Sequence, residues 1–172
     1  MTSFAITVLG HDRPGIIAAT TAALAEVGLN LEDSSMTRLR GHFAMTLICG
    51  GEATGDAVRA ALAPLSADRT LTVTVFEVPE EPTPAVAAVP YVLSVHGSDR
   101  PGIVSALTAE VAAAGGNVTD LVTRLSEDLY LVVAELDLPT AVDVAGLQAS
   151  LGVIAADLGV TATLRAVEAD EF

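Results

Sequence analysis

A four-residue sequence, Asp-Arg-Pro-Gly, occurs at residues 12–15 and again at residues 99–102. Each occurrence follows an apolar, β-branched run and precedes a helical pattern, so each is predicted to connect a strand to a helix. Proline suits the first turn of a helix, and glycine lets another group approach the backbone closely. The free amides of Gly15, Ile16 and Ile17, with the positive end of the helix dipole, would bind an anion such as a carboxylate.

The same residues have a purely structural interpretation as well. Asp12 and Asp99 are suitable N-caps for their own helices, and Pro-Gly by itself forms a turn. The presence of the sequence in two places favours a binding function, although shared folding requirements would also retain it. Both interpretations stay open at the level of sequence.

The two occurrences belong to a longer internal repeat. At an offset of 87 positions, seven of the ten residues in 8–17 are identical to those in 95–104. The matches continue, with one residue lost from the second copy, as far as residues 37–39 and 123–125. The chain is therefore predicted to be a duplicated domain.

A proline-rich stretch separates the two copies. Residues 78–90 hold four of the chain's eight prolines, and proline fixes φ and lacks an amide donor, so this stretch is predicted to be an extended linker. We therefore expect a first module at residues 1–78, a linker at 79–89 and a second module at 90–172. A linker of this length reaches roughly 40 Å when fully extended, which lets the two copies pack as a pseudo-twofold pair.

Hydrophobic periodicity predicts the same order of elements in both copies. The first copy is predicted to have strands at 3–9, 30–40, 42–49 and 70–76, a helix that includes residues 17–27 and ends at Gly28, and a weaker helix at about 55–65. The second copy is predicted to have strands at 90–96, 117–125, 129–137 and 160–167 and helices at 101–114 and 142–158. The buried face of the first helix is predicted to hold Ile17, Thr20, Leu24 and Val27. The order βαββαβ, found twice, predicts an α+β protein of two ferredoxin-like modules, each an antiparallel four-stranded sheet with two helices on one face.

Composition limits the classes of function. The chain has 22 acidic residues against 8 basic ones, all of them Arg, and its net charge is -14. Direct binding to nucleic acid is not expected, because affinity for phosphates depends on cationic contacts. The single cysteine and the lack of a signal-peptide pattern or a long apolar run predict a cytoplasmic protein without a membrane segment.

Other reactive side chains are isolated in the sequence. No two of the three histidines have the spacing of metal ligands, so neither a metal nor a cofactor is expected. Ser98 is not in a nucleophile elbow, and Cys49, at the end of an apolar strand, is predicted to be a core residue. Arg13 and Arg100 are expected to point to solvent or pair with acids, or else to contact a ligand or a partner. We predict no catalytic centre.

The duplicated pattern, with Asp-Arg-Pro-Gly-Ile followed by Gly-Leu-Asn-Leu or Gly-Gly-Asn-Val, resembles ACT domains. These are regulatory modules that most often bind amino acids, and the resemblance covers residues 3–77 and 90–168. A free-standing tandem pair is most similar to the glycine cleavage system transcriptional repressor group. The same motif occurs in the ACT segments of formyltetrahydrofolate deformylase and of nitrogen-signalling uridylyltransferases, but this chain has no room for their catalytic domains.

The resemblance also implies a ligand site in each copy. In the serine-binding ACT modules of phosphoglycerate dehydrogenase, the contacts come from the turn before the helix and from the Asn that opens the second strand. The ligand-binding residues predicted here are Gly10, His11, Asp12, Gly15, Ile16 and Asn30, and Gly97, Ser98, Asp99, Gly102, Ile103 and Asn117. Those relatives carry His in place of Gly10 and Gly97, and Asn in place of Asp12 and Asp99. An Asp would still accept hydrogen bonds from an ammonium group, while Asn and the helix amides bind the carboxylate.

Two functions follow as hypotheses. The first is an amino-acid-sensing regulatory protein that acts through a protein partner such as a transcription factor, with glycine or serine as ligand and glycine cleavage or one-carbon genes as target. The second is a regulatory subunit of an amino-acid or folate metabolic enzyme. In both cases the resemblance implies a homodimer.

Overall fold

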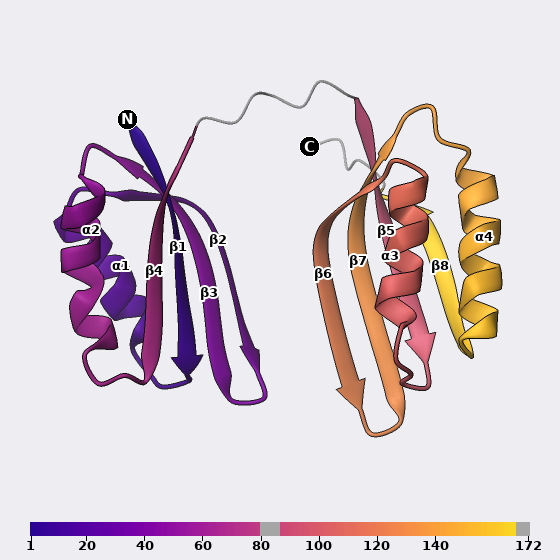
Figure 1. The fold of residues 1–172 in the computed structure, drawn as a ribbon, viewed down its shortest axis with the longest axis horizontal. Coiled ribbons are helices and arrows are strands. Elements are labelled where there is room, and N and C mark those ends of the chain that lie inside the picture. The colour runs from indigo at the N-terminus through magenta and orange to yellow at the C-terminus, as the bar shows by residue number, and fades with distance from the viewer. Residues whose placement is uncertain (80–86, 168–172) are drawn as a thin grey trace. The chain divides into compact units, whose positions relative to one another are not determined.

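The computed structural model describes residues 1–79 and 87–167, which fall into two separate units on either side of residues 80–86. We refer to these units as the first and second module (Figure 1). The first consists of β1 (Thr2–His11), α1 (Ile16–Glu26), β2 (Asn30–Leu39), β3 (His42–Gly51), α2 (Gly55–Leu62), the 3-10 helix η1 (Ala63–Ser66) and β4 (Leu71–Val78). The second consists of β5 (Ala88–Gly97), α3 (Ile103–Ala113), β6 (Asn117–Ser126), β7 (Leu129–Pro139), α4 (Val144–Asp157) and β8 (Val160–Ala166).

The predicted fold class is confirmed in both modules. The strand orders are β2-β3-β1-β4 and β6-β7-β5-β8, and every pairing is antiparallel. Both helices of a module lie on one face of its sheet (Figure 1). Because β1 and β3 pair along their whole length, the end of β1 and the start of β3 lie at the same end of the sheet.

Each module has a core of its own between the sheet and the helices. Alternate residues of a strand face opposite sides of a sheet, so Phe4, Ile6 and Val8 of β1 are all buried at 0% exposure. The residues predicted to share one face of the following strand, Phe43 to Cys49 at every second position, are likewise buried. The core placement predicted for Cys49 is thus correct. Burial raises the pKa of its thiol, and the negative charge of Glu32 raises it further.

The buried face of the first helix differs from its prediction at one position. Ile16 is 3% exposed and lies in the core with Thr20 and Leu24, whereas Ile17 is 43% exposed, so Ile17 was wrongly assigned to the buried face. Gly28 ends the helix as predicted, with a φ of 74°. The helix predicted at 55–65 is split into α2 and η1, because Pro64 in the first turn of η1 has no amide to continue the α-helical hydrogen bonds.

The internal repeat keeps a constant offset of 87 through the second strand of each module. Asp33 pairs with Ile48 and Asp120 with Glu135, and both strands have a bulge just before that Asp. The predicted loss of one residue before residues 37–39 is therefore wrong. Leu125, not Arg124, is the structural counterpart of Arg38.

Most of the predicted linker at residues 79–89 lies outside the described part of the chain. Strand β5 begins at Ala88, so the last residues assigned to the linker already belong to the second sheet. Within the described ranges, no helix has the length and apolar character needed to cross a membrane.

Candidate ligand site at the strand-to-helix turn

The Asp-Arg-Pro-Gly motif forms the turn between β1 and α1, and between β5 and α3. Gly15 and Gly102 are the N-cap residues, in the left-handed conformation with φ of 91° and 95°. Pro14 therefore precedes the helix instead of occupying its first turn, which corrects the prediction. A Cβ on Gly15 would have no neighbour within 4 Å, so the glycine is required by its φ rather than by a closely packed group.

The capping interpretation of the two aspartates is not supported. Neither α1 nor α3 has a side-chain hydrogen bond at its N-cap. The first backbone hydrogen bond of α1 runs from the Ala19 amide to the Gly15 carbonyl, at 2.9 Å. The amides of residues 16–18 consequently have no partner inside the helix and stay available to an anion.

A surface hollow of about 470 Å³ lies beside this turn in the first module. It is lined by Asp12, Arg13, Pro14, Gly15, Ile16, Ile17, Ala18, Met36 and Phe43. An Asp, a helix start and an apolar wall thus surround one space. This combination suits a small zwitterion with an apolar side chain. The ammonium group can bind the Asp, the carboxylate can bind the helix amides, and the side chain can contact the apolar wall.

Asp12 is held towards β2 by Arg38. The Arg38 guanidinium donates to Asp12 Oδ2 at 3.4 Å, with both side chains partly exposed. The second module lacks this ion pair at the equivalent position, since Leu125 takes the place of Arg38. The two turns are therefore chemically different although their sequences match.

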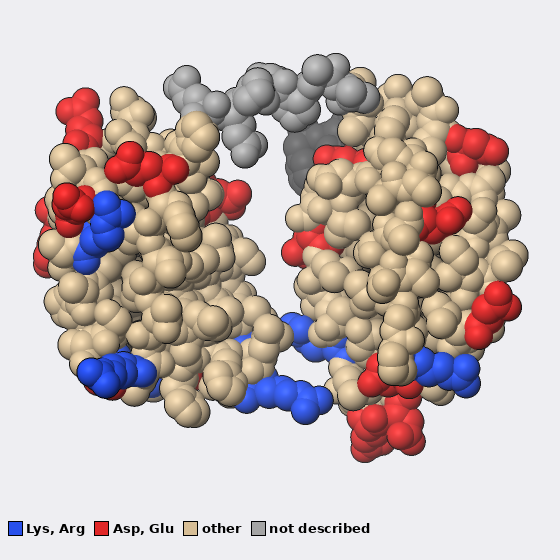
Figure 2. All heavy atoms as spheres, viewed as in Figure 1, with Lys and Arg blue, Asp and Glu red and all other residues tan. Residues whose placement is uncertain are grey.

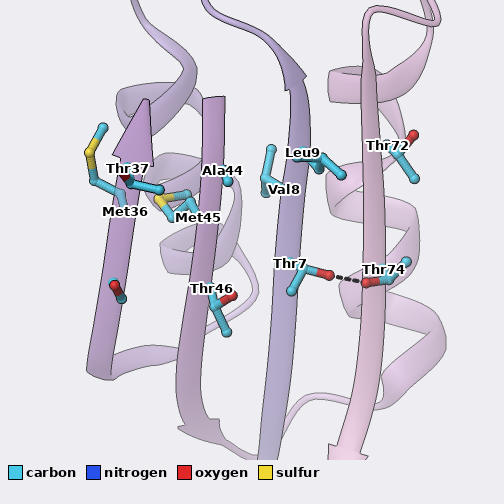
Figure 3. Close-up of a pocket in the computed structure, with 11 residues that line it drawn as sticks. Thr7, Val8, Leu9, Met36, Thr37, Ala44, Met45, Thr46, Thr72 and Thr74 are labelled. Atoms are coloured by element: carbon cyan, nitrogen blue, oxygen red, sulfur yellow. Dashed lines mark hydrogen bonds between the residues drawn. The ribbon is translucent and has the colours of Figure 1, made fainter. Parts of the chain in front are cut away.

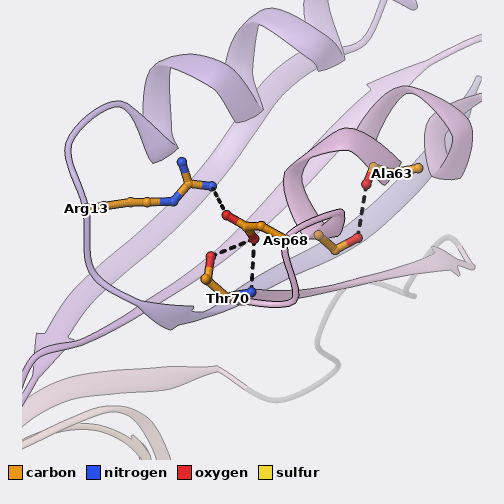
Figure 4. A network of polar contacts seen from close by, with 5 residues as sticks. Arg13, Ala63, Asp68 and Thr70 are labelled. Atoms are coloured by element: carbon orange, nitrogen blue, oxygen red, sulfur yellow. Dashed lines mark hydrogen bonds and ion pairs between the residues drawn. The ribbon is translucent and has the colours of Figure 1, made fainter.

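Arg13 is fixed on the outer side of the turn (Figure 4). Its guanidinium lies 3.5 Å from Asp68 Oδ2, while the amide and hydroxyl of Thr70 donate to Asp68 Oδ1 at 3.0 and 2.8 Å. The hydrogen bonds from Thr70 and then the charge of Arg13 lower the pKa of the Asp68 carboxyl. Of the alternatives for Arg13, pairing with an acid is the one that the structure shows. In the second module, Arg100 instead lies against Gly159.

Positive charge is gathered at the turn end of the first module. Four of the first module's five arginines, Arg13, Arg38, Arg40 and Arg69, lie in or next to the loops at that end of the sheet. Figure 2 shows Arg side chains at this end of the first module, whereas the same end of the second module also carries a group of acidic side chains. In a chain with a net charge of -14, this arrangement favours an anionic group at the turn.

Asn30 and Asn117 are not brought to the turn of their own module. Asn30 pairs with Gly50 near the far end of β3, whereas the turn follows His11, which pairs with His42. Eight residues of strand separate these pairs, or about 27 Å. The second module has the same geometry, with Asn117 opposite Asp137 and Gly97 opposite Tyr130. One ligand cannot contact both the turn and the Asn within a module.

Gly10 and Gly97 have a steric role. A Cβ on Gly10 would overlap the Thr70 carbonyl oxygen and lie 2.9 Å from the Leu71 Cα, and one on Gly97 would lie 2.8 Å from the Val160 Cα. The last strand of each module passes too closely for any side chain at these positions. This packing explains why glycine stands where the serine-binding relatives carry His.

His11 and His42 form a cross-strand pair that the sequence analysis missed. Their rings stack with centroids 5.5 Å apart and an interplanar angle of 13°. They lie outside the set of residues that line the hollow. Among the residues that the structure describes, no three His, Cys, Asp or Glu side chains gather as metal ligands would.

The repeated module has the arrangement of a known family. A model of the ACT domain matches the chain twice, at residues 2–76 and 90–165. The chain belongs to the ACT domain family. Its predicted resemblance is confirmed, and the tandem of two modules is shared with solved structures.

Individual relatives of this ACT protein differ in how much they share with it. The glycine cleavage system transcriptional repressor of Escherichia coli (strain K12) is 25% identical over 169 residues, covering 94% of this chain and 88% of the repressor. A UPF0237 protein of Methanopyrus kandleri is 50% identical over 48 residues, which are 28% of this chain and 53% of that protein, so this chain spans about half of that relative. The crystal structure of an unknown protein from Galdieria sulphuraria has a TM-score of 0.81 and 27% identity, covering 97% of this chain and 99% of that one.

Proposed function

We propose that this ACT protein senses an amino acid and acts through a protein partner, and that its targets are glycine cleavage or one-carbon genes. The observation that carries the proposal is the hollow at the start of α1, where free helix amides and Asp12 lie beside the same space. The similarity to a transcriptional repressor along almost the whole chain supports a regulatory role. A screen of thermal stability against the twenty amino acids tests the first step. A ligand at 100 times its Kd should add about 2.7 kcal/mol to the free energy of unfolding.

In the proposed site, the ligand carboxylate accepts hydrogen bonds from the amides of residues 16–18. Its ammonium group donates a hydrogen bond to Asp12 and replaces Arg38 as the partner of that carboxylate. Its side chain contacts Met36 and Phe43. The second module would use Asp99 in the same way, without an arginine to displace. Asn30 and Asn117 take no part in this one-module site, because they lie at the other end of their sheets. Glycine and serine are the ligands that the resemblance implies, whereas the apolar wall of Met36 and Phe43 favours a small amino acid with an apolar side chain.

Asp12→Ala should weaken amino-acid binding by tenfold or more, because it removes a charge-assisted hydrogen bond worth about 1.5–3 kcal/mol. The free energy of unfolding without ligand should change little, since Asp12 does not cap α1. Isothermal titration calorimetry and chemical denaturation of the same samples give both quantities. Glu26→Ala is the matched control, because it removes the same charge from the last residue of α1. An Asp12→Ala protein that binds normally would place the ligand elsewhere.

The purified chain by itself should not bind duplex DNA at physiological salt. Its net charge of -14 repels phosphate, and its 8 arginines include residues held in ion pairs. A gel-shift assay with promoter DNA of glycine cleavage genes, with and without candidate transcription factors, measures this. If the chain alone shifted the promoter DNA specifically, with a binding affinity that falls steeply with added salt, the prediction would be wrong and no partner would be needed for DNA binding.

A further inference from the structure

The turn end of the first module gathers arginines from neighbouring loops. Backbone hydrogen bonds hold these loops together, from the His11 amide to the Thr70 carbonyl at 3.1 Å and from the Asp12 amide to the Gly41 carbonyl at 3.2 Å. The β1–α1 turn, the β2–β3 hairpin and the loop before β4 therefore meet at one end of the sheet. We define the arginine cluster as the exposed arginines in or next to these loops, Arg13, Arg38, Arg40 and Arg69.

The arginine cluster makes this end of the module locally positive. It holds four of the five arginines in residues 1–79 but lies beside only two of the eight acidic residues, Asp12 and Asp68. Each of these carboxylates pairs with one member of the cluster, at 3.4 and 3.5 Å. Among the described residues, Arg40 and Arg69 form no ion pair. Two cationic groups are therefore left to attract an anion from outside the module.

The fold does not require the arginine cluster, because the second module forms the same hairpin without it. Glu127 takes the hairpin position of Arg40, with a φ of 50° against 49°, and Asp128 follows it. Leu125 stands at the position of Arg38. The same end of the second module thus carries acidic side chains (Figure 2). The cluster is a property of the first module's surface, and a binding function accounts for it better than a folding requirement does.

The cluster lies on an open surface and does not converge in one of the hollows. The hollow beside the turn has Arg13 in its lining but none of the other three arginines. Another hollow of the first module, about 360 Å³ in volume, lies on the side of the sheet opposite the helices, and no charged residue lines it (Figure 3). Cationic groups spread over a surface suit an extended anion that contacts them one after another.

Carboxylates match the chemistry of this surface. Two members of the cluster already pair with carboxylates of their own module. A protein segment rich in Glu and Asp presents the same group at intervals, and a guanidinium binds a carboxylate through two parallel hydrogen bonds. Duplex nucleic acid fits less well, because it would bring many closely spaced phosphates against a chain with a net charge of -14.

We propose that the arginine cluster binds an acidic segment of the protein partner, whose Glu and Asp side chains pair first with Arg40 and Arg69. The charge attraction steers the partner to the first module, and the second module, with Glu127 and Asp128 at the same end, repels it. The proposal rests on the proposed function in one respect, that the protein acts through a protein partner. It does not depend on the identity of the amino acid.

Fluorescence anisotropy of a labelled oligoglutamate peptide with the full chain tests the proposal. At about 0.1 M ionic strength the Debye length is about 10 Å, so acidic residues at the far end of the module are largely screened from a peptide at the cluster. The double variant Arg40→Gln/Arg69→Gln should weaken binding about tenfold, as expected for the loss of two exposed ion pairs. No carboxylate of the described residues loses a partner in this variant, so the module should stay folded.

Arg59→Gln/Arg165→Gln is the matched control. It removes the same two charges from exposed positions on α2 and β8, and its affinity for the peptide should equal that of the wild type. Arg40→Glu serves if the first variant folds poorly, because Glu127 already occupies the equivalent hairpin position of the second module. Circular dichroism checks the folding of every variant.

A wild-type protein that does not bind the peptide would overturn the proposal. So would equal weakening in the two double variants, because binding would then follow the overall charge and not the cluster. Inorganic tripolyphosphate is the competing anion: if it displaced the labelled peptide at a far lower concentration than unlabelled oligoglutamate does, the cluster would be a phosphate site instead. Amino-acid binding that persists while peptide binding is absent would reject this inference alone and leave the proposed sensing function standing.

Discussion

Gly10→Ala is expected to lower the free energy of unfolding of the first module by about 3 kcal/mol, at the upper end of the cost of overpacking. The added methyl group would overlap the Thr70 carbonyl oxygen, which belongs to the backbone and cannot rotate away. To make room, the start of β4 must move from β1, and the hydrogen bond from the His11 amide to the Thr70 carbonyl, 3.1 Å long, would be strained. Gly97→Ala should act similarly on the second module, where the Val160 Cα is the obstacle.

Urea denaturation followed by circular dichroism measures the loss. Gly152→Ala is the control, because Gly152 lies in the middle of α4 with no atom within 4 Å of an added Cβ. There the same chemical change should raise the free energy of unfolding by about 0.5–1 kcal/mol, since alanine is the better helix former. Equal effects at Gly10 and Gly152 would contradict the steric role assigned to Gly10.

Phe43→Ala is expected to destabilise the first module by about 3–5 kcal/mol, the usual cost of removing a buried aromatic ring. Phe43 is 2% exposed and sits in the core while also lining the hollow beside the turn. Its loss removes apolar packing and leaves a cavity under the start of α1. Ligand binding should fall as well, because the position of that helix start depends on this packing.

Met36 provides the comparison, because it lines the same hollow from β2 but is 49% exposed. Met36→Ala should cost less than about 1 kcal/mol of stability, as expected for a surface substitution. Any change in affinity caused by Met36→Ala would then report on the ligand contact alone. If both variants were equally unstable, the hollow would be part of the core rather than a surface site.

The sequence by itself was sufficient for the secondary structure and the fold class. Alternation in β1 and β3 and the repeated order of elements are local properties, and they predicted two βαββαβ modules with their buried strand faces. The position of the Asp-Arg-Pro-Gly turn between a strand and a helix was equally local. In α1 only the first buried position was assigned wrongly, because Ile16 and Ile17 are chemically alike and only the direction of the turn decides which enters the core.

Only the tertiary structure determined which residues meet across the sheet. Strand register placed His11 against His42, brought Arg38 to Asp12, and put Asn30 at the opposite end from the turn. It also showed that the matched letters Thr-Arg-Leu occupy different faces in the two modules. The start of β4 passes so close to Gly10 that only glycine fits there, and nothing in the sequence around Gly10 indicates this contact. These contacts join segments that are distant in the chain, so they follow from strand order and register, which neither composition nor periodicity specifies.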